Sequence, residues 1–139
     1  MVSVASSFLT SNYRSLIVAK MYFAEFADTE TGKVFQKFGH TGYNDAQKRL
    51  DNITEEYPKF KARILATAYH NDITKCQGAE MAFQAMYPKN FWLEEKLSGI
   101  TECVVLDYET RKHVIDAVRG LNDKFKKECF GEDYARSSN

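Results

Sequence analysis

Residues 16–41 read LIVAKMYFAEFADTETGKVFQKFGHT, and this stretch decides the fold. The run from Ser15 to Phe26 is rich in the β-branched and aromatic residues that favour strands. Residues 28–32 form a cluster of turn-forming residues, and residues 34–38 then alternate between apolar and polar side chains. Gly39 ends this second run. The pattern predicts two antiparallel strands that are joined by a polar loop.

Further helices and strands are predicted along the rest of the chain from helical spacing, capping residues and runs of strand formers. They are a helix from Asn44 or Asp45 to Tyr57, a strand over Phe60–Tyr69, a helix over Ile73–Met86 capped by Asp72, an irregular segment over 89–97, a short strand over Ile100–Leu106 and a helix over Glu109–Lys127. This order predicts an α+β fold in which a small, largely antiparallel sheet is flanked by helices, with a C-terminal helix.

The length and composition favour one folded domain. The chain has 139 residues, of which 44% are hydrophobic, and this excludes a disordered or low-complexity chain. We expect a loose N-terminal arm over 1–13, a single domain over 14–128 and a C-terminal tail over 129–139. The 3 cysteines lack the spacing of a zinc site, so we expect reduced thiols.

The charge balance limits the possible partners. The 19 Lys and Arg residues equal the 19 Asp and Glu residues, so no global positive field attracts nucleic acid and any anion site must be local. The sequence has no apolar run long enough for a membrane helix and no visible secretory signal. We therefore expect a cytoplasmic protein with no membrane partner.

Several short motifs follow one another along residues 16–107. They are Tyr22 in KMYF, QKFGHT at 36–41, QKRL at 47–50, Ala79-Glu80, Tyr87-Pro88 and GITEC at 99–103. In this order the chain resembles the GIY-YIG nuclease superfamily, and more closely its bacteriophage members. The resemblance implies a three-stranded antiparallel sheet between helices and hydrolysis of DNA phosphodiester bonds with one divalent cation, Mg²⁺ or Mn²⁺. For a phage-encoded protein, the compartment would be the host cytoplasm.

The resemblance also implies catalytic roles on the predicted hairpin. Tyr22 takes the place of the first-motif tyrosine, which is associated with activating the attacking water. A free phenol has a pKa near 10, so it needs a nearby cation to act as a base at pH 7. Lys37, or Gln36 one residue earlier, takes the place of the second-motif tyrosine. A lysine there can lower the pKa of the phenol or bind the scissile phosphate.

Two further catalytic residues lie on the predicted helices. Arg49 matches the helix arginine of the family, whose planar guanidinium can hold two phosphate oxygens and stabilise charge in the transition state. Glu80 matches the metal ligand, and a carboxylate is a suitable ligand for Mg²⁺. We expect Tyr22, Arg49 and Glu80 to line one groove on the same side of the sheet.

The remaining candidates are substrate-binding residues. Gln36, Gly39 and His40 lie at the end of the predicted hairpin, and His40 can touch the substrate or assist proton transfer. Lys48 adds positive charge beside Arg49. Asn90 matches a polar residue that some family members place near the phosphate.

Each of these residues also has an ordinary structural interpretation, such as a packed strand tyrosine or a solvent-exposed lysine, arginine or glutamate. Lys20-Met21 stands where the family has Gly-Ile, and the second motif has no tyrosine. The alternative function is therefore a catalytically weakened scaffold that binds nucleic acid or a host protein. Because one small chain without net charge should bind duplex DNA only weakly, we also expect self-association as a dimer.

Overall fold

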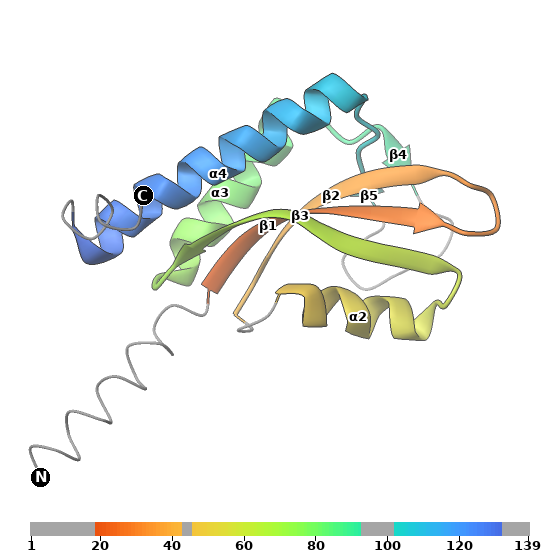
Figure 1. The fold of residues 1–139 in the computed structure, drawn as a ribbon, viewed down its shortest axis with the longest axis horizontal. Coiled ribbons are helices and arrows are strands. Elements are labelled where there is room, and N and C mark those ends of the chain that lie inside the picture. The colour runs from red at the N-terminus through yellow and green to blue at the C-terminus, as the bar shows by residue number, and fades with distance from the viewer. Residues whose placement is uncertain (1–18, 43–45, 93–101, 132–139) are drawn as a thin grey trace, which may run out of the picture.

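The computed structural model describes residues 19–42, 46–92 and 102–131, and within these ranges it confirms the predicted α+β fold (Figure 1). A three-stranded antiparallel sheet carries helices on both faces. The elements are β1 (Ala19–Asp28), β2 (Val34–Thr41), α2 (Ala46–Glu56), β3 (Phe60–His70), α3 (Ile73–Met86), β4 (Phe91–Trp92), β5 (Glu102–Cys103) and α4 (Tyr108–Phe130).

The predicted hairpin is present as β1 and β2, and β1 is the central strand in the order β2-β1-β3. The loop closes because the Asp28 carboxylate accepts the backbone N–H groups of Glu30 and Thr31 at 2.9 and 3.2 Å, while Gly32 adopts a φ of 76°. The expectation that Gly39 ends the second strand is wrong. β2 continues to Thr41, and Gly39 pairs with Tyr22 inside the ladder.

The two faces of the sheet are covered by different helices. α2 lies on one face, and α3 and α4 lie on the other (Figure 1). Successive side chains of a strand point to opposite faces. Accordingly, Tyr22 and Ala24 of β1 pack with Leu50 of α2 on one face. Met21 and Phe23 pack on the other face with side chains of α3 and α4.

The segment between α3 and α4 departs from the prediction. Phe91 and Trp92 form β4 rather than irregular chain, and of the described residues within the strand expected over Ile100–Leu106 only those of β5 belong to a strand. The Phe91 ring stacks on Phe35 at a centroid distance of 5.1 Å. Val104 exchanges two backbone hydrogen bonds with Gln36, so this segment covers part of the outer edge of β2.

The helix ends agree well with the predicted capping residues. α3 has the predicted bounds and its predicted N-cap, Asp72, which accepts from Thr74 N–H. α4 begins one residue earlier than predicted, after Asp107, and ends at Phe130, so residues 129 and 130 belong to the helix rather than to a tail. The expected arm over 1–13 and the expected caps Asn44 and Asp45 lie outside the described residues. Of the described helices, none combines the length and hydropathy needed to cross a bilayer.

Candidate active site

The Tyr22 side chain lies across the edge strand of the sheet. Tyr22 is buried on β1 and pairs with Gly39 of β2. A Cβ atom at position 39 would lie 2.4 Å from Tyr22 Cζ and 2.5 Å from its hydroxyl oxygen, closer than real Cβ contacts. The absence of a side chain at Gly39 therefore makes the room for the phenol. Because β2 is the outer strand in the order β2-β1-β3, the Tyr22 phenol packs over an edge strand, where it remains buried.

Lys37 joins Tyr22 on the face that α2 covers. It lies two residues before Gly39 and therefore on the same face of β2. Its Nζ lies 6.0 Å from the centre of the Tyr22 ring and donates to the Phe38 carbonyl at 3.4 Å. Burial lowers the pKa of Lys37, and the nearby Glu80 carboxylate opposes this shift. Lys37 and Gln36 are the two candidates for the residue beside the Tyr22 phenol, and the structure places Lys37 there.

Arg49 is directed toward the same edge by the orientation of α2. The buried residues Leu50 and Ile53 face the sheet, and Gln47 and Arg49 flank them on opposite sides of the helix. The Gln47 amide donates to the carbonyl of Ala62 at 3.1 Å and accepts the N–H of Ile64 at 3.2 Å, both in β3. The Gln47 flank therefore faces β3, and the Arg49 flank faces β2.

Glu80 reaches this edge from the other side of the sheet. It lies on α3, and its Oε1 is 2.6 Å from Nδ1 of His40, the residue after Gly39 on β2. The Glu80 Oε2 accepts from Gln84 Nε2 at 3.0 Å, and Gln77 contacts the other ring nitrogen of His40 at 3.3 Å. These contacts hold a partly buried carboxylate against the edge strand.

The electrostatics connect the four predicted catalytic residues. Burial raises the pKa of Tyr22 to about 12; the Arg49 guanidinium opposes this shift, and the Glu80 carboxylate adds to it. Glu80 thus acts on both Tyr22 and Lys37. The expectation that Tyr22, Arg49 and Glu80 line one groove on the same side of the sheet is wrong, because Tyr22 and Arg49 lie on the α2 side and Glu80 lies on α3, on the other side (Figure 1). The group is arranged around the outer edge of β2.

Two predicted substrate-binding residues do not join this group. Gln36 is fully buried on the opposite face of β2 from Lys37, where its amide oxygen accepts Leu106 N–H at 2.8 Å and its Nε2 donates to Glu25 Oε1 at 3.2 Å. The Asn90 amide pairs with the backbone of Val105, accepting at 2.7 Å and donating at 3.3 Å. Both amides hold the chain segment that leads into α4, so neither is free to bind a phosphate.

Of the other predicted substrate-binding residues, Gly39 and His40 lie at the site, as described above. Lys48 is exposed on α2, on the side away from the sheet. The sequence analysis missed Lys89, whose positive charge lowers the pKa of Lys37. It also missed Gln84, although Gln84 follows Glu80 by four residues, the spacing at which helix side chains meet.

The donor set fits one divalent cation with few protein ligands. Among the described residues there is no group of three or more His, Cys, Asp or Glu side chains that could hold a metal. Mg²⁺, however, keeps several waters and is often bound by one or two carboxylates. Each Glu80 oxygen has a second lone pair beyond the one that His40 or Gln84 occupies. Glu80 therefore fits a largely hydrated Mg²⁺ or Mn²⁺.

Comparisons with protein-family models, curated proteins and solved structures find no match to this chain. The function is therefore argued from the arrangement around Tyr22 and Glu80.

Proposed function

We propose that this protein is a metal-dependent endonuclease of the GIY-YIG type, similar to the bacteriophage members, that hydrolyses DNA phosphodiester bonds. The observation that carries the proposal is geometric: Lys37 Nζ lies 6.0 Å from the centre of the Tyr22 ring, and Glu80 contacts His40, the residue after the Gly39 that Tyr22 packs over, at 2.6 Å. In this proposal, four chemically active groups from four separate elements act together at the edge strand β2. A tyrosine that only packs in the core needs none of these partners.

Arg49 and Lys37 bind the phosphate in this proposal. The Arg49 guanidinium can hold two non-bridging oxygens in its planar fork, and the Lys37 ammonium adds a point charge beside the phenol. Both groups stabilise the negative charge that grows on the phosphate in the transition state. Lys89 adds positive charge near Lys37.

Tyr22 orients the attacking water. With a pKa of about 12, its phenol is neutral at pH 7 and holds the water by hydrogen bonding. A cation bound by Glu80 would polarise the phosphate, assist the leaving oxygen and lower the pKa of the phenol. His40 is a positioning residue, because its 2.6 Å contact keeps the Glu80 carboxylate at the edge of β2.

Nicking of supercoiled plasmid tests this function. We expect the wild-type protein to nick plasmid in the presence of Mg²⁺ or Mn²⁺ and to lose this activity when EDTA is added. Glu80→Gln should abolish nicking, whereas Glu55→Gln, at an exposed position of α2, should leave it unchanged. Absence of nicking by the wild type, or equal nicking by Glu80→Gln, would contradict the proposal.

A non-catalytic binding module is the second candidate. It is favoured by the hydrogen bonds to both Glu80 oxygens and by the raised pKa of Tyr22, because both features suit a site that stays inactive. This candidate predicts DNA binding without nicking, with an affinity that falls steeply as salt increases. Binding of a host protein in its place would weaken far less with salt.

We also propose that two copies act together on duplex DNA. The 19 positive and 19 negative side chains leave one copy without net attraction for the polyanion. Sedimentation velocity should therefore give a dimer at the concentrations used for nicking. A monomer at all concentrations used for nicking would contradict the proposal that two copies act together.

A further inference from the structure

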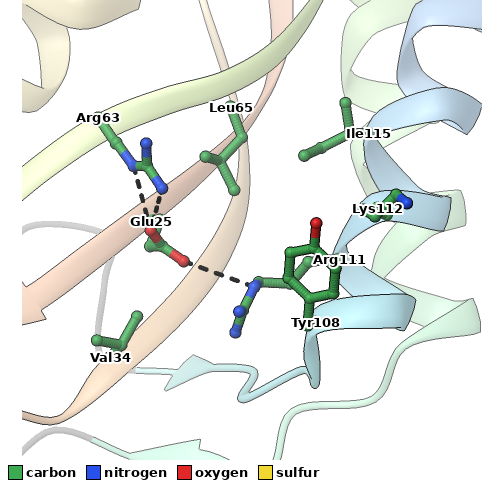
Figure 2. Close-up of a pocket in the computed structure, with 8 residues that line it drawn as sticks. All are labelled: Glu25, Val34, Arg63, Leu65, Tyr108, Arg111, Lys112 and Ile115. Carbon is green, nitrogen blue, oxygen red and sulfur yellow. Dashed lines mark hydrogen bonds and ion pairs between the residues drawn. The ribbon is translucent and has the colours of Figure 1, made fainter.

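A pocket lies on the face of the sheet that α4 covers, opposite the face on which Tyr22 packs. It has a volume of about 360 Å³ and lies between the first turns of α4 and the strands β1, β2 and β3 (Figure 2). Ligand-binding pockets of small molecules begin at about 300 Å³ and combine apolar walls with a few polar groups. This pocket has both kinds of lining.

The floor of the pocket is a carboxylate that basic side chains surround. Glu25 is 14% exposed and accepts two hydrogen bonds from Arg63, at 2.8 and 3.1 Å (Figure 2). Arg111 Nε lies 3.8 Å from its other oxygen. Lys112 also lines the pocket. Three basic side chains against one carboxylate leave the pocket positively charged, so it favours an anion.

An exposed aromatic ring stands beside this charge. Tyr108, in the first turn of α4, is 63% exposed and lines the pocket together with the apolar side chains of Leu65 and Ile115. Figure 2 shows the Tyr108 and Arg111 side chains extending from the first turn of α4. The Lys112 ammonium lies 5.6 Å from the ring centre. A flat apolar surface thus adjoins a cationic one.

We propose that this pocket binds one nucleotide unit of single-stranded nucleic acid. The base would pack against Tyr108 and the apolar wall, because every base has a face that can stack on an aromatic side chain. The phosphate would lie against Arg111 and Lys112. The inference rests on the proposed function and deepens it, since it adds a contact for a single-stranded part of the DNA on the face of the sheet opposite Tyr22.

NMR titration of the full chain with 5′-dTMP tests the proposal, with thymidine and deoxyribose 5-phosphate as ligands that lack the phosphate or the base. We expect 5′-dTMP to shift the signals of Tyr108, Arg111 and Lys112 and to bind about tenfold more tightly than either fragment. Equal affinity for deoxyribose 5-phosphate would overturn the nucleotide assignment, because only the phosphate would then be recognised.

Variants of exposed residues separate the two contacts without disturbing the core. Tyr108→Ala should weaken the binding of 5′-dTMP about tenfold, and Tyr108→Phe should preserve it because the ring remains. Lys112→Gln should weaken the binding of oligo(dT) and lower its salt slope by about one. Lys124→Gln, at an exposed position further along the same helix, is the matched control. Unchanged binding in Tyr108→Ala and Lys112→Gln would overturn the proposal.

These readouts distinguish failure of the pocket from failure of the nuclease. Signals that shift only around Tyr22 and Arg49 would overturn the pocket and leave the nuclease intact. Weaker nucleotide binding in the pocket variants of a protein that never nicks DNA would support the pocket and contradict the nuclease.

Discussion

The hydroxyl oxygen of Tyr22 lies 2.5 Å from the position that a Cβ atom of residue 39 would occupy. In a β ladder, two paired residues normally place side chains side by side on the same face. Here the Tyr22 ring also occupies the space that a side chain at position 39 would need. The missing side chain of Gly39 therefore determines where the phenol lies and lets it pack over the edge strand β2.

The substitution Gly39→Ala should displace Tyr22. The new methyl group meets a ring that is almost fully buried, so the substitution should lower the free energy of unfolding by about 1–3 kcal/mol. It should also reduce nicking, because the phenol leaves its position. Chemical denaturation and the plasmid assay measure the two effects.

A glycine in open surroundings provides the control for this substitution. Gly78 lies within α3, and nothing would stand within 4 Å of its added Cβ. Gly78→Ala should raise stability by up to about 1 kcal/mol and leave nicking unchanged. In a Tyr22→Ala background, Gly39→Ala should cost less than in the wild type. An equal cost in both backgrounds would show that the ring is not the obstacle.

Arg49 and its neighbour Lys48 should differ sharply in their effect on nicking. Arg49 lies on the flank of α2 that faces β2, and its charge acts on Tyr22. Arg49→Ala should reduce the nicking rate about 100-fold or more, and Arg49→Lys should recover little because the planar fork is lost. Lys48→Ala should have only a small effect, since Lys48 is exposed on the outer side of the helix. Equal losses in the two alanine variants would contradict the assigned role of Arg49.

The raised pKa of Tyr22 predicts a pH dependence of stability. The phenol has a pKa of about 12 in the folded protein and about 10 in the unfolded chain, so the unfolded chain releases this proton first. Its contribution is fully present below pH 10 and is lost as the pH rises from 10 to 12, by up to about 1.4 kcal/mol per pH unit. Lys37 shifts in the opposite direction.

Comparing the wild type with Tyr22→Phe isolates this effect, because Lys37 and the other titrating groups are common to both proteins. Denaturation between pH 8 and pH 11.5 should show the wild type losing stability relative to Tyr22→Phe only above about pH 10. A constant difference between the two proteins over this range would show that the phenol is not held in its neutral form.

Gln36 should matter for stability and not for cleavage. Its buried amide binds Leu106 N–H and Glu25, so Gln36→Ala leaves the partly buried Leu106 N–H without this acceptor and removes one donor from Glu25. The expected loss is about 1–3 kcal/mol of unfolding free energy. At a temperature where the variant remains folded, its nicking rate should match that of the wild type. A large loss of the nicking rate in the folded variant would show that Gln36 does contribute to cleavage.

Most of the fold follows from local signals in the sequence. The turn residues of 28–32, the Asp72 cap and the apolar spacing of Ala46, Leu50 and Ile53 each predict an element that the structure contains. The strands β4 and β5 were missed or predicted too long. They depend on contacts with distant residues, such as the stacking of Phe91 on Phe35.

The contacts around the edge strand β2 do not follow from local signals in the sequence. Tyr22 and Glu80 lie on opposite sides of the sheet, and the strand order that places β2 at the edge is not a local property of the sequence. Alternation along β2 separates Lys37 from Gln36 once the pairing with β1 is known. The roles of Asn90 and Gln36 also depend on where the chain returns after α3.

Paramagnetic relaxation by Mn²⁺ tests most directly whether Tyr22, Lys37, Arg49 and Glu80 surround one cation. In the wild-type protein, substoichiometric Mn²⁺ should broaden the side-chain NMR signals of Tyr22, Lys37 and Arg49 together, and Glu80→Gln should abolish this broadening. Broadening centred on other residues, or broadening that persists in Glu80→Gln, would contradict the central claim.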